Sequence, residues 1–275
     1  MWVFMVRPDA MRNGAGPGPL QQNELGQEIR QRELEKALAY FPVEGRILDL
    51  GAGTGFQAAR LDALGYSVTA VDIGGHESET PDPARDTLFP LDLYDGHTLP
   101  YRSGSFDVVF SSYVLEHVRD PVDLLRECSR VLAPVGKVVM VLPTFSWRLW
   151  SIAAFYVERT RSIIRGRVAG NLGATREMHS QQDHSRAYVS VFRRLIRTLI
   201  PPPHGEVGSS LTELVTYTRW CWRRILREAD LRIMEEKSLG VFSTGAFLSR
   251  MSIERRELAA RLLGGAGRVY VAVRR

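Results

Sequence analysis

The chain has 275 residues, of which 44% are hydrophobic and 24% are charged, and its formal net charge is +5. These values are typical of a folded globular protein and exclude a disordered or fibrous chain. Cys128 and Cys221 lie far apart without metal-type spacing, so we expect no disulfide framework and a reducing, cytoplasmic compartment. No segment reaches the roughly 18 to 20 apolar residues of a membrane span.

The first part of the chain predicts a βαβ unit. Residues 1–20, rich in glycine and proline, are expected to form a flexible arm, and an apolar stripe then predicts a helix over 21–41. A short apolar strand over 46–50 runs into a glycine-rich turn, and a helix follows to about residue 64. A second strand is predicted over 66–72, so the two strands should be parallel with a right-handed crossover.

The alternation of strands and helices continues to residue 143. Residues 74–90 read as a loop, strands are predicted over 107–111 and 137–142, and a helix over 121–132 lies between them. Residues 144–205 show helical periodicity only, and a helix over 214–229 and strands over 231–239 and 268–273 follow. We therefore expect an α/β fold, a doubly wound and mostly parallel seven-stranded sheet with a helical insertion after the fifth strand.

The turn after the first strand has the chemistry of a ligand site. Glycines at 51, 53 and 55 permit positive φ angles and close approach of a ligand, and the helix start adds unpaired N–H groups. A dinucleotide loop would need a third glycine where Phe56 stands, which disfavours a pyrophosphate. Asp72 follows about 20 residues later at the end of the second strand, where a carboxylate can accept both hydroxyls of a ribose.

Six motifs between residues 45 and 142 resemble, in the right order, those of class I S-adenosylmethionine-dependent methyltransferases. They are Ile47–Gly55, Val71–Asp72, Asp95–Tyr101, Ser105–Val109, Val114–Val118 and Arg130–Gly136. The match is most like the broad group that methylates small molecules and lipids. Val135 stands where the family usually has a glycine, a departure that affects a turn.

The resemblance implies a role for each matching position. The loop would lie along the methionine part of the cofactor with Asp49 near its amino group, and Asp72 would bind the ribose. Asp95 would bond the adenine amino group, with Gly96 offering a backbone contact and Asp92 as a rival, and two residues past the fourth strand would lie near the transferring methyl. The cofactor-binding residues expected in this way are Asp49, Gly51, Ala52, Gly53, Thr54, Gly55, Asp72, Ile73, Asp92 or Asp95, Gly96, Ser112 and Tyr113.

Four histidines are candidates for a general base in methyl transfer to a hydroxyl. His117 and His204 are the catalytic residues that we expect, and His179 and His184 are further candidates. The alternative for His117 is local hydrogen bonding at a helix start, and for the others an ordinary surface position. We expect no bound metal, because no group of ligand-type residues has a convincing metal-site spacing.

Residues 144–205 differ in charge from the rest of the chain. Ten arginines against three acids give this segment a net charge of +7, and tryptophans and other apolar residues accompany the first arginines. In this fold an insertion after the fifth strand lies above the ligand site. It could be a helical lid with a solvated basic face, or it could bind an anionic or lipid-linked substrate and touch an anionic membrane surface; RNA is disfavoured.

The expected organisation is an arm (1–20), a cofactor-binding half (21–143), an arginine-rich insertion or lid (144–205), and a C-terminal helix with the final strand pair (206–275). Residues 204–206 with Glu213, Tyr217 and Trp220 resemble methyltransferases that modify polysaccharides and lipid-linked glycans. The predicted function is S-adenosylmethionine-dependent O-methylation of a small-molecule, sugar or lipid-linked glycan acceptor. The alternatives are C-methylation of a quinone-type lipid and a non-catalytic cofactor-binding scaffold. The sequence leaves the oligomeric state open.

Overall fold

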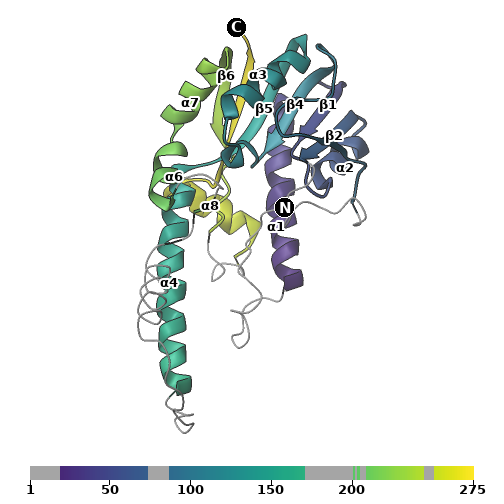
Figure 1. The fold of residues 1–275 in the computed structure, drawn as a ribbon. Helices are drawn as coiled ribbons and strands as arrows, with labels where there is room; N and C mark the ends of the chain where they lie inside the picture. The colour runs from purple at the N-terminus through teal and green to yellow at the C-terminus, as the bar shows by residue number, and fades with distance from the viewer. Residues whose placement is uncertain (1–18, 74–86, 171–200, 202, 205–208, 245–250) are drawn as a thin grey trace, which may run out of the picture.

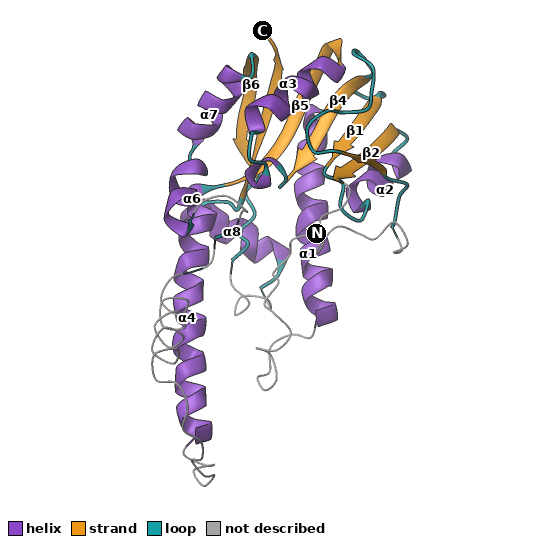
Figure 2. Cartoon of the chain, viewed as in Figure 1, coloured by secondary structure: helices purple, strands orange, loops and turns teal. Residues whose placement is uncertain are grey.

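The computed structural model describes residues 19–73, 87–170, 201, 203–204, 209–244 and 251–275. Seven strands form one mixed sheet in the order β3-β2-β1-β4-β5-β7-β6, with helices on both sides (Figure 1, Figure 2). The first five strands in this order run parallel, and β7 pairs antiparallel with both β5 and β6. This arrangement confirms the expected mostly parallel seven-stranded sheet.

The strand bounds agree closely with the sequence pattern where a strand is long and apolar. They are β1 Arg46–Leu50, β2 Ser67–Ile73, β3 Asp92–Tyr94, β4 Phe106–Ser112, β5 Leu132–Pro143, β6 Leu231–Ser238 and β7 Gly267–Arg274. The sequence analysis did not locate β3, because three residues are too few to show a period of two.

The described helices include three that the sequence analysis placed incorrectly or missed. The helix bounds are α1 Pro19–Ala37, α2 Phe56–Ala63, α3 Pro121–Val131, α4 Phe145–Gly170, α6 Ser210–Thr216, α7 Arg219–Glu228 and α8 Ile253–Leu263, with short 3₁₀ turns η2 Leu38–Tyr40 and η3 Leu115–His117.

The single helix expected over 214–229 is wrong. The chain forms α6 and α7 instead, and Thr218 begins the second helix by accepting a hydrogen bond from the Cys221 N–H. Helix α8 was missed, because its apolar positions are largely exposed, as Leu258 and Leu262 show. The amphipathic signal of a helix depends on a buried face, and that face is narrow here.

The sheet buries a separate apolar core on each face, and alternate residues of one strand enter different cores. Leu48 and Leu50 of β1 pack in the core under α3 and α7, whereas Ile47 packs in the core under α1 and α2. In β4, Val109 belongs to the first core and Phe110 to the second. Because both faces are covered, these strands are almost continuously apolar in sequence, as expected for a parallel sheet.

Helix α1 is attached to the end of β4 by a buried polar contact. The Tyr113 hydroxyl donates to Glu33 Oε1 at 2.7 Å, and the Glu33 side chain is almost completely buried. Gly267, at the start of β7, makes room for this pair, because a Cβ atom there would lie 2.5 Å from the Tyr113 hydroxyl and 2.9 Å from Glu33 Oε1. Burial raises the pKa of Glu33, because the buried surroundings disfavour the charged carboxylate. The charge of Arg30 and the hydrogen bond from Tyr113 act in the opposite direction and stabilise the carboxylate.

Helix α4 projects away from the sheet beyond α6 and is the described part of the expected insertion (Figure 1). Residues 171–200, which include the base candidates His179 and His184, lie outside the described residues, as do residues 1–18 of the arm expected over 1–20. The last two residues of that expected arm, 19 and 20, belong to helix α1 instead. Among the helices that the structure describes, none combines the length and apolar character needed to cross a membrane.

Gly267→Ala should lower the free energy of unfolding by about 1–3 kcal/mol, because the new methyl group collides with the Tyr113 hydroxyl. The check is the urea midpoint at constant m-value. Tyr113→Phe removes the colliding oxygen, so the double variant should lose clearly less than the two single losses added together. Additive losses would contradict this account of Gly267.

Candidate functional site

The glycine-rich loop lies at the carboxyl end of β1 and requires glycine for steric reasons. Gly51, Gly53 and Gly55 all have positive φ angles, of 73°, 60° and 76°. A Cβ at Gly51 would lie 2.3 Å from Val114 Cγ2, and a Cβ at Gly55 would lie 2.8 Å from Phe89 Cβ. The loop therefore keeps a backbone conformation and a close packing that other residues would disrupt. Helix α2 begins directly after it.

Asp72 joins the loop to the neighbouring strand β2. Its Oδ2 accepts a hydrogen bond from the Gly53 N–H at 2.6 Å, and its Oδ1 accepts one from the Ile73 N–H at 2.7 Å. The N–H groups of Gly51 and Ala52 both donate to the Val71 carbonyl oxygen. These contacts bring the two sequence motifs together, with Ala52 and Thr54 in the turn, as a parallel βαβ unit requires.

Asp49 is a buried carboxylate beside this loop. Its side chain is 1% exposed, and its Oδ2 makes no hydrogen bond to any residue that the structure describes. Burial, followed by the negative charge of Asp72, raises the pKa of Asp49 to about 7. A buried oxygen without a partner needs a donor or a cation from a ligand.

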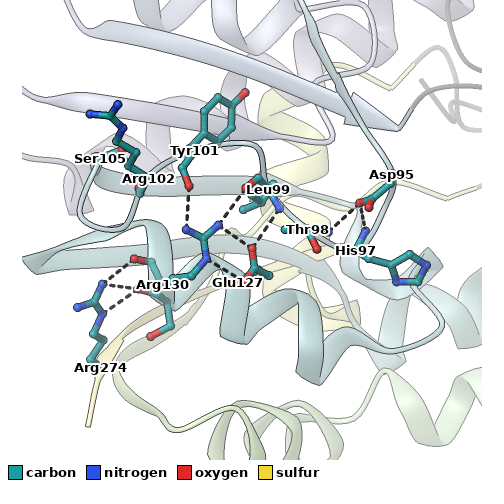
Figure 3. A network of polar contacts seen from close by, with 11 residues as sticks. Asp95, His97, Thr98, Leu99, Tyr101, Arg102, Ser105, Glu127, Arg130 and Arg274 are labelled. Carbon is teal, nitrogen blue, oxygen red and sulfur yellow. Dashed lines mark hydrogen bonds and ion pairs between the residues drawn. The ribbon is translucent and has the colours of Figure 1, made fainter.

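The segment after β3 is fixed by hydrogen bonds to its own backbone and to α3 (Figure 3). Asp95 Oδ1 accepts from the N–H groups of His97 and Thr98, which lowers the pKa of Asp95. The Arg130 guanidinium donates to the carbonyl oxygens of Leu99 and Tyr101, and Glu127 accepts from the Leu99 N–H. The segment is therefore rigidly placed at the edge of the sheet.

The two acids near β3 have different positions. Asp92 begins the strand, lies opposite Val71, and accepts a hydrogen bond from the Tyr101 hydroxyl at 2.8 Å. Asp95 follows the carboxyl end of the strand, beyond the Ile73–Tyr94 pair, and the backbone of Gly96 (φ 82°) lies near the Ile73 side chain. Of the two, Asp95 is the one at the same edge as Asp72.

Ser112 and Tyr113 end β4 at this edge, and α1 contacts both. Arg30 donates to the Ser112 hydroxyl at 3.2 Å, and its guanidinium lies 4.1 Å from the centre of the Tyr113 ring. Tyr113 has a positive φ of 58°, which is unusual for a residue with a side chain. The sequence analysis missed Arg30 and Glu33, because α1 precedes the βαβ unit and nothing in its pattern distinguishes them.

The structure brings together the two histidines that the sequence analysis selected as catalytic. The rings of His117, in η3, and His204, before α6, have centroids 5.1 Å apart. Glu116 completes the group, and one ligand-type atom from each of the three residues lies within 4.8 Å of the others. The sequence analysis missed Glu116 as a candidate. It also could not foresee a cluster whose members come from such distant parts of the chain.

His204 is held in place from α4 and α6. Its backbone N–H donates to Glu213 Oε1 at 2.6 Å, and Glu213 Oε2 lies 2.8 Å from Nε of Arg148 in a buried ion pair. The Trp147 ring packs edge-on against the imidazole at 4.7 Å. Burial, with the nearby charges of His117, Arg148 and Arg30, lowers the pKa of His204 to about 3, so this imidazole is neutral near pH 7.

Comparison with known protein families supports the interpretation of the loop and strand ends. Residues 48–140 match the family described as "Methyltransferase domain", which covers the motifs from the glycine loop to β5. A solved S-adenosylmethionine-dependent methyltransferase from Mesorhizobium loti has the same fold with a TM-score of 0.50 at 20% identity. That alignment covers 88% of this chain and 98% of the other.

Two curated relatives align with part of the chain. A ubiquinone biosynthesis O-methyltransferase from a Caulobacter species is 36% identical over 135 residues, 43% of this chain and 52% of the relative. A demethylmenaquinone methyltransferase from Clavibacter sepedonicus is 41% identical over 105 residues, 37% of this chain and 43% of the relative. The chain thus spans about half the length of these relatives. Residues 48–140 thus match a methyltransferase domain, and the loop geometry and the fold are similar to those of class I, S-adenosylmethionine-dependent methyltransferases.

Proposed function

We propose that the protein transfers the methyl group of S-adenosylmethionine to a hydroxyl oxygen of a small-molecule acceptor. The observation that carries this proposal is the joined pair of motifs at the sheet edge, in which Asp72 contacts the glycine loop at 2.6 Å beside the buried Asp49 carboxylate. The names of the two curated relatives, one a ubiquinone O-methyltransferase and one a demethylmenaquinone methyltransferase, support an acceptor of the quinone class.

The residues at the edge fit the cofactor group by group. The unpartnered Asp49 oxygen suits the amino group of the methionine part, and the glycine loop leaves no side chain in its way. Asp72 suits the ribose hydroxyls, as a carboxylate at the end of the second strand does in related nucleotide sites. We assign the adenine contact to Asp95 and Gly96 rather than Asp92, because Asp95 follows the carboxyl end of β3 at the edge where Asp72 lies, whereas Asp92 begins the strand.

When bound, the cofactor supplies a methyl group on a positively charged sulfur. Transfer would join the acceptor oxygen to the methyl carbon and leave the electron pair of the broken carbon–sulfur bond on sulfur, while the chain's own residues would orient the acceptor and accept its hydroxyl proton. We place the acceptor hydroxyl near the cluster of Glu116, His117 and His204, because Glu116 and His117 follow Ser112 closely in the chain and His204 packs against His117. There His117 would take the proton as a general base, and His204, whose pKa is lowered to about 3, would be a much weaker proton acceptor. The rest of the rate enhancement would come from positioning.

The first test is cofactor binding by calorimetry with Asp72→Asn. This variant keeps an oxygen for the Gly53 N–H but loses the negative charge that holds two ribose hydroxyls. We expect the Kd for S-adenosylhomocysteine to rise at least tenfold, equivalent to about 1.4 kcal/mol. The matched control is Asp123→Asn, on the exposed surface of α3, which should bind like the wild type.

Turnover is tested with the same two variants and radiolabelled S-adenosylmethionine. The acceptors are a quinol-type lipid with free hydroxyls, a lipid-linked sugar and RNA. We expect the label in the quinol-type lipid, with Asp72→Asn impaired and Asp123→Asn active. Label on carbon would favour the alternative C-methylation, and tight cofactor binding without turnover of any acceptor would favour the scaffold alternative.

Asp49→Asn should raise the thermal stability of the cofactor-free protein at pH 8 more than at pH 5. The folded-state pKa of about 7 lies above the ordinary value of 3.8, so the wild type loses stability as the pH rises through 7 and the carboxyl ionises in a buried place. The neutral amide has no such loss. We expect the free energy of unfolding of Asp49→Asn to exceed that of the wild type by at least about 1 kcal/mol at pH 8. Added cofactor should raise the thermal midpoint of the variant less than that of the wild type, and thermal unfolding measures both effects. The same gain at both pH values would show that the carboxylate charge is unimportant.

We further propose that α4 contacts an anionic lipid surface while the acceptor is delivered. The segment 144–205 has a net charge of +7, and Leu149, Tyr156 and Val157 on α4 are exposed apolar side chains. In vesicle flotation, phosphatidylglycerol should retain the protein and phosphatidylcholine should not, with less retention at high salt. Arg159→Glu with Arg161→Glu should weaken retention. No retention on phosphatidylglycerol would contradict the proposal.

A further inference from the structure

Three side chains with metal-binding atoms converge beside the end of β4. The carboxylate of Glu116 and the imidazoles of His117 and His204 each offer one atom, and these atoms lie within 4.8 Å of one another. His117 Nε2 and Glu116 Oε1 are 3.9 Å apart, which is too long for a hydrogen bond. The three groups are thus gathered at a spacing that leaves room for an atom between them.

Glu116 has the burial and the environment of an incomplete ion site. Its side chain is fully buried, and neither carboxylate oxygen makes a hydrogen bond to any of the residues that the structure describes. Burying a carboxylate without a partner is costly, and a bound cation is one of the few ways to offset that cost. The same burial raises the pKa of Glu116 to about 8 while no ion is bound.

We propose that Glu116, His117 and His204 bind one divalent transition-metal ion, with Zn²⁺ as the representative case. Two imidazoles and one carboxylate form the ligand set of catalytic zinc sites and of Fe(II) sites, and three protein ligands leave a position open. Ligand bonds of about 2.0–2.2 Å place two ligands of one ion at most about 4.4 Å apart. The 3.9 Å between His117 Nε2 and Glu116 Oε1 lies within this limit, whereas the 4.8 Å that bounds all three pairs exceeds it, so binding of an ion would draw the ligand atoms slightly closer together.

The surroundings orient the ligands and balance their charge. Glu213 accepts from the His204 backbone N–H and pairs with Arg148, so one of the two arginines whose charges act on His204 has an acidic partner. Arg30 is the other cation that faces the cluster, and it lies between Ser112 and the Tyr113 ring. An ion with one carboxylate ligand keeps a net positive charge here, which suits a site that binds an electron-rich oxygen.

This inference rests on the proposed function for its chemical meaning and makes that function more specific. The open position of the ion would take the acceptor's hydroxyl oxygen and lower its pKa, so the proton leaves without a histidine base. His117 and His204 then act as ligands instead of proton acceptors. The acceptor class that follows is a phenol-type or sugar hydroxyl, because a carbon acceptor would gain nothing from coordination.

The test uses the full-length protein, stripped of metal with a chelator and titrated with Zn²⁺ in competition with a chromophoric chelator. We expect one ion per chain, a higher thermal midpoint with Zn²⁺, and visible absorption bands when Co²⁺ replaces it. His204→Ala and, separately, Glu116→Gln should weaken Zn²⁺ binding by more than about 10- to 100-fold, the range for loss of a mere outer-shell partner. His97→Ala, an exposed histidine outside the cluster, is the matched control and should bind like the wild type.

The outcomes separate this inference from the proposed function, because cofactor binding is measured on the same samples. No stoichiometric Zn²⁺, or equal affinity in the wild type, His204→Ala and Glu116→Gln, would overturn the metal site even if S-adenosylhomocysteine binds. Zn²⁺ binding without cofactor binding would instead overturn the proposed function. If Glu116→Gln does not fold, the Co²⁺ spectrum of His204→Ala decides: an unchanged spectrum overturns the assignment of the ligands.

Discussion

The parallel run of β3, β2, β1, β4 and β5 brings the carboxyl ends of five strands to one edge of the sheet, and the rest of the site depends on this constraint. The glycine loop follows β1, Asp72 lies near the end of β2, Asp95 follows β3, and Ser112 ends β4. Each is brought there by its strand, and the central strands β1 and β4 are buried on both faces under helices. The binding chemistry thus follows from burying a nearly continuous apolar sheet on both sides.

Much of this arrangement is predictable from the sequence, because the βαβ unit carries strong local signals. The apolar run of β1, the glycines at positive φ and the acid at the end of β2 are adjacent features with a known spatial relation. The short β3, the break at Thr218 and helix α8 were not predicted, since their signals are short or depend on tertiary burial. Local periodicity predicts an element only where the element is long and has a broad buried face.

The polar groups around β4 show where prediction from sequence ends. His117 and His204 were chosen one at a time, but their contact depends on how α4 and α6 return the chain to the sheet, which no local pattern encodes. Glu116, Arg30 and Glu33 gain their meaning from burial and from partners that lie far away in the sequence. The properties of such groups depend on the tertiary structure around them. A glutamate on an ordinary surface helix would be solvated and would have no comparable role.

The contact of Glu33, Tyr113 and Gly267 also indicates how much of the chain is needed for a stable fragment that contains the cofactor loop. It joins helix α1, the end of β4 and the start of β7. Helix α1 precedes the segment that carries the methyltransferase motifs, and β7 follows it. The segment 48–140 that matches the family contains Tyr113 but neither Glu33, which accepts the hydrogen bond of its hydroxyl, nor strand β7, where Gly267 makes room for the pair. A fragment cut to those limits would expose this tyrosine to water and leave Ser112 without Arg30. Recombination or truncation at residues 48 and 140 would therefore separate the cofactor loop from Arg30, Glu33 and β7, which hold the end of β4 in place.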